Sequence, residues 1–293
     1  MLKVAIIGLG VMGKNHLKTL KNIPNAEVIA TCDPISKSEP NIAHYRNLDA
    51  LLKNHTPEVA IIATPTSFHV ESAKACMQKG INVLIEKPLA RNLAEARELK
   101  EFASKMSVKA VLGHVERFNP VIAALKNELK DKTIYAIHTT RISPFPARIA
   151  DVGVLADLGV HDIDLIRFLS RREITESHIA KSRHRHATCE DSANISLKLQ
   201  DDILAHVRLC WLSSFKQREV EILCKEGVFR ADLIAQELKF YTHVDANSFT
   251  QKNIFVKKSE ALVGELESFF ALLRGESSDI ASIDDGIETL KFI

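Results

Sequence analysis

The chain has 293 residues, a length that suits two domains and can bury a large core without disulfides or metals. Its net charge is +2, and its 46% hydrophobic and 26% charged residues are close to the globular average. This balance argues against a protein built around a concentrated basic face for nucleic acid. No apolar run reaches the roughly 18 residues of a membrane span, so we expect a soluble protein with neither nucleic-acid nor membrane partner.

The N-terminus and the cysteines indicate the compartment. Met1 leads straight into an apolar run that ends at glycines, without the basic and long apolar regions of a signal peptide. The five cysteines are odd in number and have neither a disulfide-framework nor a zinc spacing. His184 and His186 have no third ligand nearby in the sequence. We therefore expect a cytoplasmic protein with buried thiols and no metal site.

The first 113 residues alternate between short apolar runs and stretches of helical periodicity. The apolar runs are 4–7, 28–32, 59–63, 83–85 and 110–112, and the helical stretches are 17–20, 48–52, 70–77 and 93–102. Continuous apolar strands that alternate with helices are typical of a parallel sheet covered on both faces. This rhythm predicts an α/β domain over residues 1–118.

A glycine motif follows the first apolar run directly. It reads Gly8-Leu9-Gly10-Val11-Met12-Gly13 and opens a helical stretch, the context expected of a dinucleotide-binding fingerprint. Gly8 suits a tight turn, a side chain at Gly10 would block the pyrophosphate, and Gly13 lets helix and strand pack closely. The pyrophosphate is expected at the helix N-terminus, where free N–H groups favour an anion. The alternative is a glycine turn that binds no ligand.

Asp33 ends the second apolar run, 20 residues after Gly13. An acid at this position accepts hydrogen bonds from the adenosine ribose hydroxyls. Its charge repels the 2′-phosphate of NADP, and Pro34 follows where an NADP enzyme often carries arginine. We therefore predict NAD as the cofactor, while the nearby Lys37 keeps NADP open as the alternative.

After residue 120 the rhythm changes, which predicts a second domain over residues 119–293. Helix-like segments cover 120–129, 162–169 and 261–273, and strand-like runs cover 134–141, 193–199, 204–211, 220–224 and 228–233. Short links join several of these runs, which indicates antiparallel neighbours.

Two further motifs are more specific. Glu86-Lys87-Pro88 closes the fourth apolar run, and Asp157-Leu158-Gly159-Val160-His161 lies in the second domain. Together with the glycine fingerprint, and with Thr64, Pro65 and His69 after the third run, they resemble the Gfo/Idh/MocA oxidoreductase family. The resemblance implies a Rossmann domain followed by an α+β domain with a large, mostly antiparallel sheet. One face of that sheet needs cover, so we expect a homodimer or homotetramer built on it.

The resemblance also assigns roles to residues. Lys87 matches the lysine that contacts the substrate hydroxyl and the nicotinamide ribose, and the Lys87–Pro88 bond is a candidate for the cis isomer. His161 matches the proposed acid/base, and Asp157 the acid that binds substrate and supports the histidine. A neutral imidazole suits proton removal from an alcohol near pH 7, and an ammonium stabilises the alkoxide. The alternative for His161 is a helix-capping histidine. The expected cofactor-binding residues are Gly8, Gly10, Val11, Met12, Gly13, Asp33, Thr64, Pro65, His69, Glu86 and Lys87.

A narrower resemblance concerns the substrate. Several segments are similar to the subgroup that includes UDP-N-acetylglucosamine 3-dehydrogenases, which oxidise the C3 hydroxyl of a UDP-linked acetamido sugar. In that subgroup an aminotransferase usually converts the 3-keto product towards a 3-amino sugar for a lipid A variant or another surface glycan. The segments are 113–120, 141–162 and 190–193, and Trp211 with Lys216 and Arg218 after it.

A UDP-sugar brings two phosphates, which guanidinium forks suit. Three arginines lie on segments expected to border the cleft, although pairing with Glu116, Asp151 or the cofactor is the alternative for them. The expected substrate-binding residues are Arg117, Asn119, Arg141, Arg148 and His161.

Two other functions compete with this one. A dehydrogenase of a free polyol or sugar, such as an inositol, would use the same site. A non-catalytic dinucleotide-binding regulator would use the same fold, but it predicts the loss of Lys87 or His161, and both are present.

Overall fold

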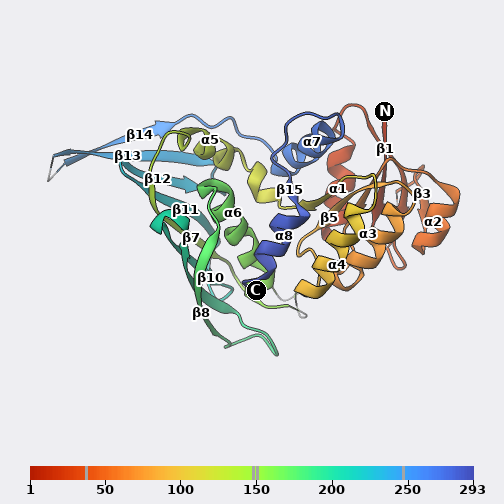
Figure 1. The fold of residues 1–293 in the computed structure, drawn as a ribbon, viewed down its shortest axis with the longest axis horizontal. Helices are drawn as coiled ribbons and strands as arrows, with labels where there is room; N and C mark the ends of the chain where they lie inside the picture. The colour runs from red at the N-terminus through yellow and green to blue at the C-terminus, as the bar shows by residue number, and fades with distance from the viewer. Residues whose placement is uncertain (37–38, 147–148, 150–151, 246–247) are drawn as a thin grey trace. The chain divides into compact units, whose positions relative to one another are not determined.

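The computed structural model describes residues 1–36, 39–146, 149, 152–245 and 248–293. The chain divides into two units, one made of residues 1–115 and 262–291, the other of residues 116–261 with 292–293. Figure 1 labels most of their helices and strands. Among the described residues, no helix has both the length and the apolar character needed to cross a membrane.

The first unit is built on a seven-stranded sheet. Its strands are β1 (Leu2–Ile7), β2 (Ala26–Cys32), β3 (Ala43–Tyr45), β4 (Val59–Ile62), β5 (Asn82–Glu86), β6 (Ala110–Gly113) and β15 (Ala281–Ser282). Its helices are α1 (Val11–Leu20), α2 (Leu48–Asn54), α3 (His69–Met77), α4 (Leu93–Ser104), α7 (Ala261–Leu273) and α8 (Ile283–Leu290).

The strands of this sheet run in the order β15-β6-β5-β4-β1-β2-β3, and all neighbours are parallel except β15, which is antiparallel to β6. Helix α1 packs on β1 and β2, and α3 packs on β4 and β5. Every residue of β4 is buried, as in a strand covered on both faces. The predicted α/β class is confirmed, with a Rossmann-like parallel sheet.

The C-terminal segment returns to this first unit. β15 adds to the sheet edge by pairing Ala281 with Leu112 and Ser282 with Val111 of β6. The sequence prediction instead places residues 262–291 in the second domain and puts the domain boundary at residue 118. The structure differs from this prediction because β15 joins the sheet through backbone hydrogen bonds. A two-residue strand of this kind needs no particular side chains, so it leaves no pattern in the sequence.

The second unit is built on an eight-stranded sheet. Its strands are β7 (Ile134–Ile142), β8 (Ile174–Ser182), β9 (Ser192–Leu199), β10 (Leu204–Cys210), β11 (Gln217–Cys224), β12 (Gly227–Asp232), β13 (Glu237–Asp245) and β14 (Ser248–Ile254). Its helices are α5 (Pro120–Glu128) and α6 (Val160–Ser170). The order is β14-β13-β12-β11-β7-β10-β9-β8, and among the described residues only β7 and β10 pair in parallel. The antiparallel pairs expected from the short links, β9 with β10 and β11 with β12, are confirmed.

One face of this sheet carries the core of the unit. Ile137 on β7, Val207 on β10 and Ile222 on β11 are fully buried in a cluster that includes Ile122 of α5 and Ile166 of α6. The two helices therefore cover this face, and buried side chains on it alternate with exposed ones along β10.

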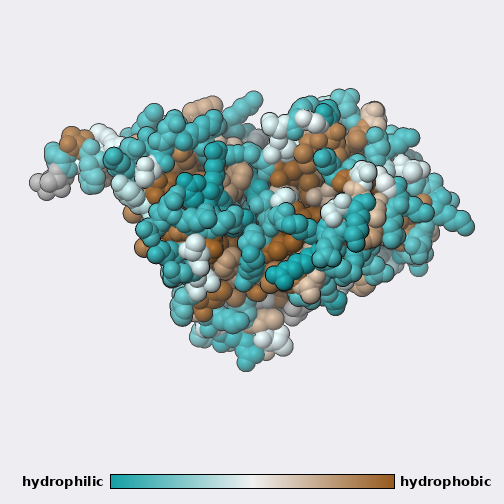
Figure 2. Space-filling model, in the orientation of Figure 1, coloured by the Kyte–Doolittle hydropathy of each residue, from teal (hydrophilic) through white to brown (hydrophobic). Residues whose placement is uncertain are grey.

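The β13–β14 hairpin carries exposed apolar side chains. Nearly all residues of β14 are exposed, and Val244 and Phe249 are 63% and 66% exposed. Figure 2 shows apolar atoms at the end of this hairpin, beside the residues drawn in grey. Apolar side chains gathered on an exposed strand pair are typical of an interaction surface.

Candidate active site

The glycine fingerprint lies between β1 and α1. Gly8 has φ +93°, and a Cβ atom there would lie 2.5 Å from the carbonyl oxygen of Ala63. A Cβ atom on Gly13 would lie 1.9 Å from the Gly8 carbonyl oxygen, whereas one on Gly10 would meet no atom within 4 Å. Two of the glycines are therefore needed for close packing. The third keeps a space open in front of the helix.

The N-terminus of α1 faces that space without a cap. Gly10 is the N-cap residue and makes no side-chain hydrogen bond, and the first turn, which begins with Val11 and Met12, contains no acidic residue. The first N–H groups of the helix are therefore available to an anion, which the helix dipole also favours. The open space and the uncapped helix together fit the pyrophosphate of a dinucleotide.

Asp33 follows β2 and holds the fingerprint loop. Its Oδ2 accepts a hydrogen bond from the Leu9 N–H at 2.7 Å, and its Oδ1 accepts from Ile35 at 2.9 Å and Ser36 at 2.6 Å. Burial raises the pKa of Asp33, but these N–H donors outweigh it, so the pKa lies below its ordinary value. The group is a carboxylate at the end of β2, where the ribose of a dinucleotide is expected.

The loops after β4 and β5 are tied together by His69. Its Nδ1 lies 2.9 Å from the Pro88 carbonyl oxygen, and its Nε2 lies 2.9 Å from that of Thr64. Burial lowers the pKa of His69, so the ring is neutral and donates to one carbonyl at a time. Because the ring is 1% exposed, His69 supports the two loops and offers no nitrogen to the cofactor, whereas the sequence analysis expected it to bind the cofactor.

Thr64 and Pro65 begin the loop after β4. The Thr64 hydroxyl is buried and has no hydrogen-bond partner among the described residues, so it can serve a bound ligand. Pro65 leads the short 3-10 turn Thr66–Phe68 that precedes α3.

Glu86 and Lys87 end β5 at the same edge of the sheet. Ile7, Ile62 and Ile85 pair in register across β1, β4 and β5, so the residues that follow them meet at one edge. Glu86 is 6% exposed, Lys87 is half-buried, and the Lys87–Pro88 peptide is cis, as expected from the sequence. The predicted cofactor-binding residues thus gather at the carboxyl ends of parallel strands, where such sheets bind ligands.

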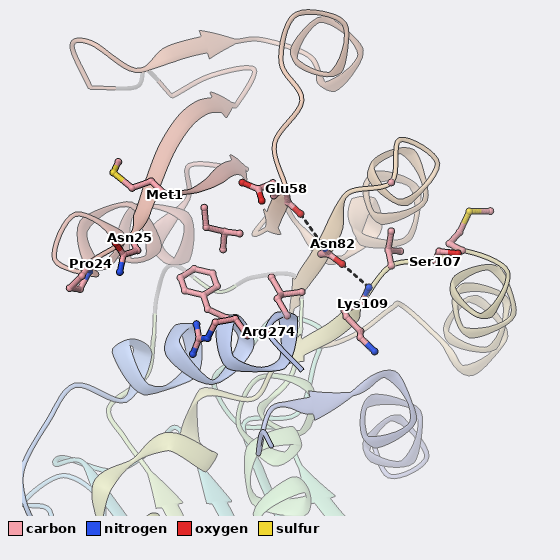
Figure 3. Close-up of a pocket in the computed structure, with 14 residues that line it drawn as sticks. Met1, Pro24, Asn25, Glu58, Asn82, Ser107, Lys109 and Arg274 are labelled. Carbon is pink, nitrogen blue, oxygen red and sulfur yellow. Dashed lines mark hydrogen bonds between the residues drawn. The ribbon is translucent and has the colours of Figure 1, made fainter. Parts of the chain in front are cut away.

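A large cavity lies at the opposite edge of this sheet. Its volume is about 1140 Å³, and Leu2, Asn82 and Lys109 line it near the amino ends of β1, β5 and β6 (Figure 3). The Asn82 amide donates to the Glu58 carbonyl oxygen, and its carbonyl oxygen accepts from the Lys109 N–H. The position at the amino ends separates this cavity from the dinucleotide edge.

In the second unit, Asp157 lies in a π-helical turn, Leu155–Gly159, that runs directly into α6. Glu190 holds this turn, because its Oε1 accepts from the Leu155 N–H at 3.1 Å and its carbonyl oxygen accepts from the Val154 N–H at 3.0 Å. Asp157 and His161 are both half-buried. Single π turns occur frequently at functional sites.

Arg141, on the core face of β7, is the centre of a buried ion-pair network. Its Nε lies 2.7 Å from Asp162 Oδ2, and its Nη1 lies 2.7 Å from Glu116 Oε1. Arg218 Nη1 reaches the same Glu116 oxygen at 3.2 Å. Burial raises the pKa of Glu116, but Arg141 and then Arg218 outweigh it, so the pKa is lowered. The network fastens α6, which carries His161, to β7.

Arg117 and Asn119 have structural partners as well. Arg117 forms a bidentate pair with Asp164 of α6, with Nε–Oδ2 and Nη2–Oδ1 distances of 2.7 and 2.5 Å. Asn119 caps α5 by accepting from the Val121 N–H, and its amide donates to the Leu233 carbonyl oxygen at 2.9 Å.

These contacts correct the expected substrate-binding set. Arg117, Arg141 and Asn119 are 7%, 3% and 6% exposed, and their polar groups already have partners within the chain. Arg141 pairs with Glu116, as in the alternative raised above, and also with Asp162, whereas Arg117 pairs with Asp164. Arg148, Asp151 and Lys37 lie outside the described residues. Of the cations noted in the sequence, Lys216 and Arg218 are exposed.

The sequence analysis did not predict two of the carboxylates that pair with these arginines. Asp162 and Asp164 lie 21 and 47 residues from the arginines that they pair with, and no sequence spacing relates the two. For Asn119 a readable signal exists, since asparagine directly before proline is typical of a helix N-cap.

A glycine fingerprint, followed by an acid after the second strand, at the carboxyl edge of a parallel sheet is typical of a dinucleotide-binding domain. Residues 2–114 match the sequence profile described as "Oxidoreductase family, NAD-binding Rossmann fold", and residues 133–230 match the GFO/IDH/MocA C-terminal domain. The chain therefore belongs to the Gfo/Idh/MocA oxidoreductase family.

Named relatives are distant. The chain is 24% identical to the rhizopine catabolism protein MocA of Rhizobium meliloti, over 98% of this chain and 92% of that protein. It is 25% identical to the UDP-N-acetylglucosamine 3-dehydrogenase of Acidithiobacillus ferrooxidans, over 92% of this chain and 87% of the enzyme.

Solved structures share the fold. A structure of that A. ferrooxidans enzyme has a TM-score of 0.90 at 23% identity, covering 99% of this chain and 94% of the other. A levoglucosan dehydrogenase in complex with NADH has a TM-score of 0.86 at 19% identity, with the same coverage.

Arg141→Met tests the structural role of the network. We expect it to lower the free energy of unfolding by about 3–5 kcal/mol, because it leaves two buried carboxylates without their main partner. Chemical denaturation measures this. Arg230→Met, at the exposed pair with Glu221, is the control and should cost less than about 1 kcal/mol. Equal stability of the two variants would show that Arg141 is not a structural cation.

Proposed function

We propose that the chain catalyses NAD-dependent oxidation of the C3 hydroxyl of a UDP-linked acetamido sugar, with UDP-N-acetylglucosamine as the substrate. The observation that carries the proposal is a pair of features. The dinucleotide edge of the first unit ends in Lys87, and the second unit presents half-buried Asp157 and His161 where a π turn meets α6. Membership of an oxidoreductase family supports redox chemistry at these residues.

The proposed chemistry divides among three side chains. His161 takes the proton of the sugar hydroxyl as general base, and the Lys87 ammonium stabilises the negative charge that develops on the oxygen. Asp157 binds the substrate and supports the histidine. Bound NAD accepts the hydride from the sugar carbon. The contribution of the chain is to hold these groups in position.

NAD is the proposed cofactor, and NADP is disfavoured. Asp33 is a carboxylate at the end of β2, and its three N–H donors keep it ionised. A negative charge there repels a 2′-phosphate.

The choice of a UDP-sugar rests on two supports. The first is the likeness to the A. ferrooxidans enzyme along nearly the whole chain. The second is the pair of exposed cations, Lys216 and Arg218, near the start of β11. Arg218 lies on the same face of β11 as buried Val220 and Ile222, the helix-covered face. We propose that these cations, together with Arg148, bind the diphosphate.

Two partners complete the proposal. The 3-keto product calls for an aminotransferase that converts it to a 3-amino sugar. The second copy of this chain is the other partner, in a dimer or tetramer that covers the open face of the second sheet and the exposed apolar side chains of the β13–β14 hairpin.

Cofactor choice is tested by titrating NADH and NADPH into the protein and its Asp33→Asn variant. We expect NADH to bind more tightly to the unaltered protein. Asp33→Asn keeps an acceptor oxygen but loses the charge, so the ratio of the NADPH to the NADH dissociation constant should fall by about tenfold. Asp49→Asn, on the exposed surface of α2, should leave it unchanged. Tighter binding of NADPH by the unaltered protein contradicts the proposal.

Catalysis is tested with Lys87→Ala and His161→Ala. Each should lower turnover by on the order of a hundredfold or more, the usual worth of positioned proton transfer, while NADH binding persists. Lys79→Ala removes an exposed lysine of the same unit and should have no effect. Near-normal turnover in either active-site variant would remove that residue from the mechanism.

The substrate is tested by following NADH formation with UDP-N-acetylglucosamine and with free polyols. Turnover is expected with the nucleotide sugar, UDP alone should compete, and NMR should locate the keto group at C3. Arg218→Ala and Arg148→Ala should each weaken UDP binding by about 1.5–3 kcal/mol, as expected for a lost charge-assisted contact. Turnover of a free polyol but of no UDP-sugar would replace the proposal with a polyol dehydrogenase.

A further inference from the structure

Three buried titratable side chains meet inside the first unit. One of them, Glu86, directly precedes Lys87 in the sequence. His16 comes from α1, Glu86 from the end of β5 and Glu265 from α7. They are 0%, 6% and 0% exposed, and one nitrogen or oxygen atom of each lies within 4.8 Å of those of the other two. The cluster joins the helix of the glycine fingerprint, the strand that ends at Lys87 and the C-terminal segment.

Within the cluster, His16 and Glu86 form a direct hydrogen bond. His16 Nε2 lies 2.7 Å from Glu86 Oε1. Burial raises the pKa of Glu86, but the bond from His16, with the nearby Lys87 and His69, outweighs it and the pKa is lowered. Glu86 is therefore a carboxylate, which can only accept, and the proton of this bond must sit on His16 Nε2.

Glu265 is the unusual member. Both of its oxygens are buried and have no hydrogen-bond partner among the described residues. Burial, and then the charge of Glu86, raise the pKa of Glu265 well above its ordinary value. An isolated buried carboxylate would cost several kcal/mol, and a bound proton removes that cost. The same proton supplies the donor that the neighbouring Glu86 carboxylate can accept.

We propose that Glu265 is held as a neutral carboxylic acid that donates to Glu86, and that His16 and Glu265 together orient Glu86 and so position Lys87. Glu265 is then a positioning residue, which acts through Glu86. This second step rests on the proposed role of Lys87, whereas the protonation of Glu265 does not depend on any substrate.

A metal ion is the competing occupant, since a histidine and two carboxylates can ligate zinc. The observed geometry disfavours it, because the 2.7 Å between His16 Nε2 and Glu86 Oε1 is that of a direct hydrogen bond, with a proton between the two atoms, and is shorter than the separation of two ligand atoms on one tetrahedral zinc. A cation would have to replace that proton. A proton on Glu265 and a bound metal ion predict opposite effects of Glu265→Gln on the thermal midpoint.

The first experiment compares thermal midpoints of the unaltered protein and Glu265→Gln from pH 5 to pH 9. A glutamate whose pKa is raised by folding stabilises the fold below its unfolded pKa, and this stabilisation is lost as pH rises towards the folded pKa. Glu265→Gln cannot ionise and escapes this loss. Its midpoint should therefore exceed that of the unaltered protein at pH 8, by a margin that shrinks towards pH 5.

Glu267→Gln is the matched control, two residues along α7 and exposed, and it should show no such pH-dependent gain. A lower midpoint for Glu265→Gln than for the unaltered protein at pH 8 would mean an ionised, paired Glu265 and would overturn the proposal. Stoichiometric metal in the purified protein, lost to EDTA with a falling midpoint, would overturn it as well.

The second experiment tests positioning through turnover with whichever sugar the protein oxidises. Glu265→Met has a similar length and no donor, and should lower kcat about tenfold through misplacement of Lys87, with NADH affinity unchanged. Glu265→Gln still donates and should restore kcat to near the original value. Glu265→Leu replaces the methionine variant if that one does not fold.

Unchanged kcat in the apolar variant would overturn the positioning step and leave the protonation result standing. Failure of the unaltered protein to oxidise any sugar would refute the proposed function instead, and the midpoint experiment would still decide the state of Glu265.

Discussion

A carboxylate that folding removes from water must meet a hydrogen-bond donor or give up its charge, and this constraint shapes both units. In the second unit Arg141 meets Glu116 and Asp162, which fastens α6 to β7 beside His161. In the first unit His16 meets Glu86, directly before Lys87. The residues proposed to react are themselves only half-buried, so their placement is inherited from buried neighbours in the chain. The placement of the proposed catalytic residues therefore depends on charge burial as much as on apolar packing.

Close packing around the glycine fingerprint is a second constraint on the first unit. Gly8 and Gly13 leave no room for a side chain, because the backbone after β4 and the fingerprint loop itself occupy the space. Gly10 is different, since nothing in the chain fills the space in front of it. The same motif thus contains two glycines that the fold requires and one that only a ligand requires. A substitution at Gly10 would test ligand binding without disturbing the packing that Gly8 and Gly13 provide.

The parallel sheet could be predicted from the sequence because both faces of its strands are buried, which gives continuous apolar runs such as Val59–Ile62. Strands β8 and β14 left no such signal, because almost all of their side chains are exposed. The fingerprint and Asp33 were readable because their roles depend on local spacing. The partners of Arg117 and Arg141, and the meeting of Glu265 with Glu86, were not, because only the completed fold brings those segments together. Arginines that resemble ligand-binding residues in a sequence can instead hold parts of the fold together. The feature that distinguishes them is a buried carboxylate far along the chain.

The charge balance of the second unit bears on its substrate. Its site network matches three guanidiniums with three carboxylates, namely Arg117, Arg141 and Arg218 with Glu116, Asp162 and Asp164. A diphosphate bound to Arg141 would leave buried carboxylates uncompensated, at a cost of several kcal/mol. Arg218 can turn towards a ligand at a smaller cost, because its side chain is 43% exposed and Glu116 keeps its shorter bond to Arg141. The cations that hold α6 and those that can meet a phosphate are therefore different residues on one sheet face.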